Sequence, residues 1–154
     1  MTSHVDYCNS LLYGLPKCQL ERVQKVINAA ARVVASLRKF DHITPTLIDL
    51  HWLPIEQRIE FKILLLTFKA LHGKSPAYIK DMIVVDSQCV YGLRSKKATK
   101  LMVPKTLCKT LGDRSFAYAA PFLWNKLPNH IRTATSLDVF KKSLKTHLFK
   151  LSYK

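Results

Sequence analysis

The acidic side chains are the first place to look for chemistry in this 154-residue chain. Two-metal polymerases and nucleases need carboxylates that converge on ions about 4 Å apart. This chain has no adjacent Asp pair, and its ten acids are dispersed over its length. We therefore predict that it is not an independent enzyme. The acids are Asp6, Glu21, Asp41, Asp49, Glu56, Glu60, Asp81, Asp86, Asp113 and Asp138.

The histidines and cysteines have no spacing that indicates a nucleophile or a metal. Asp41 and His42 are neighbours, and we interpret them as turn residues. No cysteine pair has CxxC spacing, so a zinc site is not expected. No Gly-rich phosphate loop occurs. We expect no cofactor, no metal and no small-molecule substrate, and free thiols at Cys8, Cys18, Cys89 and Cys108.

The charge is strongly positive and unevenly distributed. Lys and Arg number 25 against 10 Asp and Glu, which gives +15. Residues 1–85 hold 11 basic and 7 acidic side chains, whereas residues 86–154 hold 14 and 3. Such a surface attracts polyanions, because neutralised phosphates release condensed counterions. Anionic membranes and acidic proteins are alternative partners by charge alone.

A helix from about Lys17 to Leu37 is predicted to carry the clearest binding surface. Its apolar residues fall at steps of three and four, which defines one buried face. Basic residues lie near one line on the other side, with small Ala29 and Ser36 between them. Small residues let a phosphate backbone approach the helix, although an ordinary solvated basic face has the same composition. The basic residues are Arg22, Lys25, Arg32 and Lys39.

The core is predicted around a helix that begins at Pro54 and ends near His72, with Gly73 as its stop. Apolar residues surround it almost completely, so it should be buried, with Arg58, Lys62 and Lys69 marking one wet edge. The aromatic residues Tyr118, Phe122 and Trp124 are interpreted as core rather than as base-stacking groups. Tyr7 and Tyr13 are weak candidates for edge contacts.

Shorter helices are predicted from turn and cap residues. They run from Ser3 to Tyr13, from Thr44 and Pro45 to Leu50, from Ser75 and Pro76 to Ile83, and from an Asp113 cap through Pro121, where a kink or restart is expected. Ser136 should cap a final helix with an apolar seam from Leu137 to Leu151. Between Val84 and Leu111 we expect a loop with one or two short strands, near Leu101–Val103 and Thr106–Leu111.

These elements predict a mostly α fold, a helical bundle with a small β or irregular insert. We divide it into a helical core (1–83), a basic insert (84–111) and C-terminal helices that pack on the core (112–154). No run of apolar residues is long enough to span a membrane. The start, MTSHVDYC, lacks the features of a secretory signal, so we expect an intracellular protein of nucleus or cytoplasm.

Four segments resemble, in order, the region that follows the polymerase core in LINE-type, jockey-like non-LTR retrotransposon reverse transcriptases. They are DYCNSLLYGLPKCQLERVQKVINAAARVVASLRK (Asp6 to Lys39), FDHITPTLIDLHWLPIEQRIEFKILLLTFKALHGKSPAYI (Phe40 to Ile79), GDRSFAYAAPFLWNKLPNHIR (Gly112 to Arg132) and SLDVFKKSLKTHLF (Ser136 to Phe149). The family's fingers and palm, with their catalytic aspartates, lie upstream of this region and are absent from this chain.

The resemblance implies a non-catalytic, thumb-adjacent segment that holds template RNA or an RNA–DNA hybrid beside the upstream palm. We expect sequence-independent contacts between basic side chains and phosphates. The alternatives are a degenerate protein-interaction module or transposon remnant, and a helix-turn-helix DNA-binding protein whose first helix has little basic character. Charge and helical face select Arg22, Lys25, Arg32, Arg38 and Lys39, then Arg94, Lys96, Lys97 and Lys100, as binding residues. Arg114 and Arg132 flank the third block without an assigned role.

Overall fold

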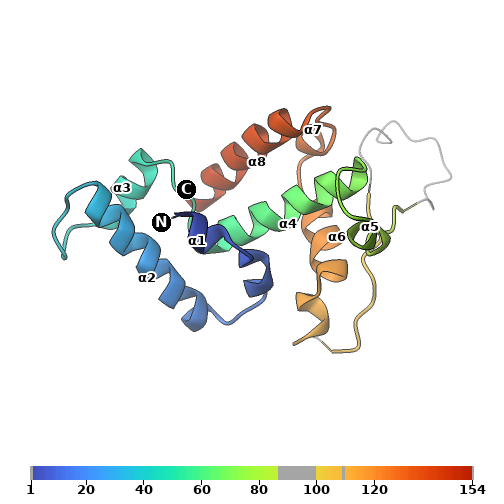
Figure 1. Ribbon diagram of the computed structural model, residues 1–154, viewed down its shortest axis with the longest axis horizontal. Coiled ribbons are helices and arrows are strands. Elements are labelled where there is room, and N and C mark those ends of the chain that lie inside the picture. The colour runs from blue at the N-terminus through green and yellow to red at the C-terminus, as the bar shows by residue number, and fades with distance from the viewer. Residues whose placement is uncertain (1, 87–99, 109, 154) are drawn as a thin grey trace. The chain divides into compact units, whose positions relative to one another are not determined.

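The computed structural model describes residues 2–86, 100–108 and 110–153. They are mostly α-helical, as predicted, with α- and 3-10 helices joined by short turns (Figure 1). The elements are α1 (Thr2–Asp6), η1 (Asn9–Leu12), α2 (Lys17–Val34), α3 (Ile43–Asp49), α4 (Ile55–Leu71), α5 (Ala77–Asp81), η3 (Gly112–Arg114), α6 (Phe116–Lys126), α7 (Asn129–Arg132) and α8 (Leu137–Ser152).

The chain forms two compact units, and the division falls inside α4 and α8. One unit contains Met1–Phe61 and Thr146–Lys154, and the other contains Lys62–Lys145. These limits differ from the boundaries at 83/84 and 111/112 that composition suggested. A change of composition marks where local pattern changes, whereas a compact unit is defined by contacts between distant segments.

In the first unit, α2 places an apolar face in the core. Gln24 joins that face to the start of α4, because its side-chain oxygen accepts the Ile55 N–H at 2.8 Å. This bond satisfies a first-turn N–H that has no partner within the helix. At the other end of the chain, the Tyr153 hydroxyl donates to the Trp52 carbonyl at 2.6 Å. The buried side chains of this unit include Leu20, Ile27, Ala30, Ala31, Leu47, Leu53, Ile55, Ile59 and Leu148.

The second unit is built on aromatic packing. Phe68 of α4 stacks on Phe140 of α8 with ring centroids 4.3 Å apart, and Trp124 lies 5.8 Å from Phe140. All three side chains are almost completely buried. Tyr118 and Phe122 stack on each other at 5.6 Å. Trp124 is therefore a core residue, as the sequence indicated.

The predicted β structure is reduced to an isolated antiparallel bridge between Val85 and Leu101. No strand forms within the described residues of the insert, so the expected strand at Thr106–Leu111 is wrong. The N–H and carbonyl of Leu101 are instead bonded by a side chain. Asn125 accepts from the Leu101 N–H at 3.0 Å and donates to its carbonyl at 2.7 Å. A side-chain amide thus replaces a neighbouring strand.

Helix ends account for most of the other differences. The predicted Ser3–Tyr13 helix is interrupted at Cys8, whose φ of 52° cannot continue a right-handed helix. Helix α2 ends at Val34 rather than Leu37, because Ser36 (φ 53°) begins a Schellman turn with bonds from Ser36 to Val33 and from Leu37 to Arg32. Helix α3 begins at Ile43, ahead of the predicted Thr44 cap.

Of the two N-cap residues predicted for the C-terminal helices, one is confirmed and one is wrong. Ser136 caps α8 as predicted, since its hydroxyl accepts the Val139 N–H at 3.3 Å. Asp113 does not cap α6, which begins at Phe116 after Ser115. Its carboxylate accepts from the Thr106 hydroxyl. Helix α6 is continuous through Pro121, so the expected restart is wrong.

Candidate nucleic-acid interface

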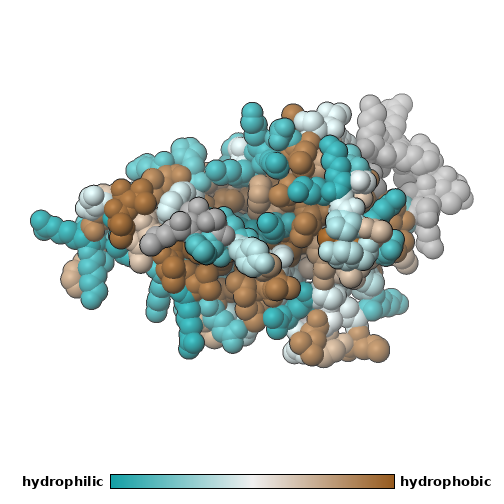
Figure 2. All heavy atoms as spheres, in the orientation of Figure 1, coloured by the Kyte–Doolittle hydropathy of each residue, from teal (hydrophilic) through white to brown (hydrophobic). Residues whose placement is uncertain are grey.

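The outer face of α2 is the strongest candidate for a binding surface. Arg22 and Lys25 are exposed, and so is Ala29 one turn later. Residues at steps of three and four share one face of a helix, so these side chains form a stripe. Figure 2 shows hydrophilic side chains projecting over α2, at left, beside apolar atoms. Some of the apolar exposure on this helix comes from Val26 and Val33, which are 57% and 75% exposed.

Arg32, the third cation of the predicted stripe, is held by the protein. It is half-buried, and its Nη2 donates to the Asp41 carbonyl at 3.4 Å. Its Nε is buried without a hydrogen-bond partner. The structure therefore places Arg32 next to the turn between α2 and α3. Its guanidinium bonds that turn and is less available to a ligand than an exposed cation.

That turn carries the next two predicted residues. Arg38 and Lys39 are exposed, and the Lys39 ammonium lies 5.7 Å from the centre of the Phe40 ring. The carboxylate of Asp41 accepts the Arg38 N–H at 2.8 Å, and the Asp41 N–H donates to the Arg38 carbonyl at 3.2 Å. These bonds fix a short turn that continues the cationic surface beyond the end of α2.

The remaining predicted residues belong to the basic insert. Lys100 is exposed, and its carbonyl accepts the Asp86 N–H at 3.0 Å. It belongs to the second unit, whereas the α2 and turn residues belong to the first. Arg94, Lys96 and Lys97 lie outside the described residues. The first unit therefore contains Arg22, Lys25, Arg32, Arg38 and Lys39, the first three on α2 and the last two on the turn after it.

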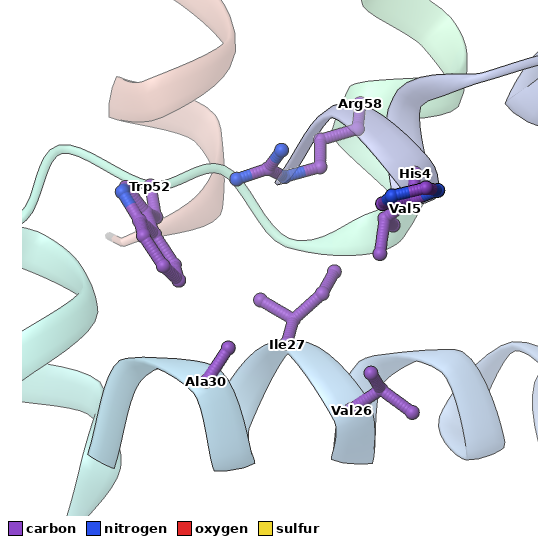
Figure 3. A pocket seen from close by; sticks show the side chains of 7 residues that line it. All are labelled: His4, Val5, Val26, Ile27, Ala30, Trp52 and Arg58. Carbon is purple, nitrogen blue, oxygen red and sulfur yellow. The ribbon is translucent and has the colours of Figure 1, made fainter. Parts of the chain in front are cut away.

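An apolar cavity lies beside α2 and is bordered by Val26, which follows Lys25. Its volume is about 170 Å³, and its lining is almost entirely carbon. Figure 3 shows Val26, Ile27 and Ala30 on α2 below the cavity, His4 and Val5 of α1 at upper right, Trp52 at left, and Arg58 above, between them. The cavity holds no cluster of acids and bases that could perform acid–base chemistry.

Arg58 borders that cavity and is not on a solvent-exposed edge of α4, contrary to the sequence prediction. Its side chain is 11% exposed and its Nη1 contacts both carboxylate oxygens of Asp6 at 3.0 and 3.1 Å. Its Nε donates to the Leu53 carbonyl at 2.7 Å, and its guanidinium lies 5.8 Å from the Trp52 ring centre. Arginine suits such a site because its planar fork bonds several acceptors at once. Lys62 and Lys69 are half-buried.

Arg132 has a structural role as well. Its Nη2 donates to the Asn129 side chain one turn earlier in α7, and its Nε and Nη1 are buried without hydrogen-bond partners. Burial lowers the pKa of this guanidinium from its ordinary value, because the charged form loses hydration. Burial likewise raises the pKa of the Tyr153 hydroxyl.

Neither a metal-binding cluster nor a membrane-spanning helix occurs among the described residues. Among residues 2–86, 100–108 and 110–153, no group of three or more His, Cys, Asp and Glu side chains could hold a metal ion. No helix in this part of the chain has the length and apolar character needed to cross a membrane. The best-supported feature is the cationic face of α2 and the turn after it.

Comparison of the chain with protein-family models, with curated proteins and with solved structures gives no match in any of the three. The class that the structure itself defines is a mostly α-helical, strongly basic protein with an exposed cationic helix face.

Proposed function

We propose that this chain is a non-catalytic region of a LINE-type reverse transcriptase, or a remnant of one, that binds template RNA or an RNA–DNA hybrid. The sequence support is the resemblance of its four ordered segments to the region after the polymerase core. The structural observation that carries the binding proposal is the exposure of Arg22 and Lys25 on one face of α2. On the other side of the helix the buried residues are Leu20, Ile27, Ala30 and Ala31.

The proposed binding is electrostatic and independent of sequence. Arg22 and Lys25 contact phosphates, and exposed Ala29 leaves room for the backbone to approach the helix. Arg38 and Lys39 extend the same surface at the turn. Phosphate contacts position a nucleic acid without reading its bases. In this proposal the palm of the parent polymerase supplies the catalytic aspartates and is the protein partner.

The test is the double change Arg22→Gln and Lys25→Gln. Gln keeps the helix propensity of the original residues, so folding should persist and is checked by circular dichroism. Each lost phosphate contact should flatten the plot of log K against log salt by about 0.7–0.9. The matched control is Lys145→Gln with Lys150→Gln, which removes the same charge from exposed positions of α8. If both doubles bind RNA–DNA hybrid alike, the α2 face is not the site.

A protein-interaction module remains the second candidate, and the exposed valines of α2 favour it. Val26 directly follows Lys25, and Val33 directly follows Arg32. Val34 is also 60% exposed. An apolar partner surface would cover them. Val26→Asp with Val33→Asp should then abolish the protein contact. For nucleic-acid binding, the added negative charge should weaken affinity mainly at low salt.

A further inference from the structure

Phe40 is an aromatic side chain held almost entirely in solvent. It is 92% exposed, more than any aromatic of the core. It lies between the C-terminal end of α2 and the first residue of α3. Isolated exposed apolar residues are common on protein surfaces. The surroundings of Phe40 are what distinguish it.

The turn that carries Phe40 is rigidly built. The Schellman bonds at Ser36 and Leu37 fix the end of α2. The Asp41 carboxylate accepts the Arg38 N–H, the Asp41 N–H donates to the Arg38 carbonyl, and Arg32 donates to the Asp41 carbonyl. Because these bonds hold the residues on both sides, ordering the turn on binding costs little conformational entropy. The backbone that carries the ring is therefore ordered before any ligand binds.

Two cations precede the ring on the same turn. Arg38 and Lys39 are both exposed, and the Lys39 ammonium is 5.7 Å from the ring centre. An aromatic face beside cations matches one nucleotide, with a base to stack and phosphates to neutralise. The bases of a duplex are already stacked on each other, so the matching ligand is an unpaired nucleotide.

We propose that Phe40 stacks on an unpaired base of single-stranded nucleic acid while Arg38 and Lys39 contact the flanking phosphates. This proposal rests on the nucleic-acid binding proposed for α2 and adds a preference within it. Strands that carry an unpaired overhang should bind more tightly than blunt duplexes of the same charge. The preference should be tolerant of sequence, since every base has a π face.

The probe is a hybrid duplex with a short single-stranded overhang that contains 2-aminopurine, whose fluorescence falls when it stacks. Wild type should quench the fluorescence, and Phe40→Ala should remove the quenching and weaken binding about 5- to 150-fold. Phe40→Trp should retain both effects. Phe40→Leu keeps an apolar side chain without a π face, so it should lose the quenching. Tyr78→Ala, an exposed aromatic of α5, is the matched control and should behave as wild type.

Unchanged quenching and affinity in Phe40→Ala would overturn the stacking proposal. Full quenching and affinity with Phe40→Leu would also overturn it, because an apolar contact would then suffice. The Arg22→Gln and Lys25→Gln double, measured on the blunt duplex, separates the two proposals. Weakened blunt-duplex binding in that double, with no effect of Phe40→Ala, leaves α2 binding intact and rejects stacking. Absence of wild-type binding to either probe rejects both.

Discussion

Arg58 is a largely buried, hydrogen-bonded residue in the fold, whereas the sequence predicts that it is solvent-exposed. By helical position it belonged to a solvated edge of α4. In the structure it bonds Asp6, which is 52 residues away, and the Leu53 carbonyl. No local sequence pattern predicts a partner at that separation. Arg22 and Lys25, by contrast, are exposed as predicted, because helical periodicity alone determines which face they occupy.

The Asp6–Arg58 pair should contribute measurably to stability. Asp6→Asn removes the charge opposite a guanidinium that is 11% exposed. We expect a loss of about 1–2 kcal/mol in the free energy of unfolding. The estimate is below that for a fully buried pair, because the Asp6 side chain is 44% exposed and partly screened by solvent.

Asp138→Asn is the comparison for that measurement, since Asp138 pairs with Lys141 on the surface at 3.6 Å and is 86% exposed. Its loss should be smaller, less than about 1 kcal/mol. Urea denaturation monitored by circular dichroism gives both values. Equal effects from the two changes would show that the Arg58 pair is only a surface contact.

Cys108 should be more reactive than Cys8 and Cys18. All three thiols are exposed. Hydrogen bonds, the first from the Thr110 hydroxyl at 3.1 Å, lower the pKa of the Cys108 thiol from its ordinary value. A lower pKa gives more thiolate near neutral pH, and thiolate is the nucleophile. Iodoacetamide labelling followed by mass spectrometry should modify Cys108 before Cys8 and Cys18, and Thr110→Val should slow the labelling of Cys108. Cys89 lies outside the described residues. Equal rates for the three residues would contradict this.

At the scale of the element, α4 tests the buried-helix prediction. No residue from Gln57 to Leu71 is exposed, so the nearly all-round apolar pattern did indicate burial. Burial still differs around the helix. Leu64 is 1% exposed, whereas its neighbour Leu65 is half-buried. Leu64→Ala should cost about 2–5 kcal/mol and Leu65→Ala distinctly less. Equal costs in chemical denaturation would contradict the assigned faces.

Asn125 should hold the insert in place through its paired bonds to Leu101. Asn125→Ala removes both and leaves the Leu101 backbone without its partner beside a buried side chain. We expect a loss of about 1–3 kcal/mol. The specific readout is faster hydrogen exchange at the Leu101 amide. Asn125→Asp keeps the acceptor and loses the donor, so it should protect that amide better than alanine. Unchanged exchange in Asn125→Ala would contradict the assignment.

Elements with strong periodicity could be predicted from the sequence, and their junctions could not. The ranges of α2, α4 and α8 follow apolar spacing, with Gly73 ending α4 in a left-handed conformation (φ 66°) as expected. The non-glycine residues Cys8, Ser36 and His51 adopt similar φ values without such a signal. Leu151 continues the seam of α8 by spacing yet is 53% exposed. Tertiary contacts decide these positions.

At the scale of the whole molecule, each unit has its own packing, and the units share two continuous helices. That arrangement could not be predicted, because the division follows contacts between segments far apart in the sequence. The net charge of +15 is known from the sequence alone, and it has a physical consequence. A strongly cationic chain binds polyanions with an affinity that depends steeply on salt.

The most direct test of the central claim is the affinity of the intact wild-type chain for an RNA–DNA hybrid across a salt series from about 50 to 200 mM. Fluorescence anisotropy with two hybrids of unrelated sequence gives log K against log salt. Phosphate contacts by Arg22, Lys25, Arg38 and Lys39 predict a negative slope of about 3, at about 0.7–0.9 per contact, with equal affinity for both sequences. Absence of binding at about 50 mM salt, or a slope near zero, would contradict the account.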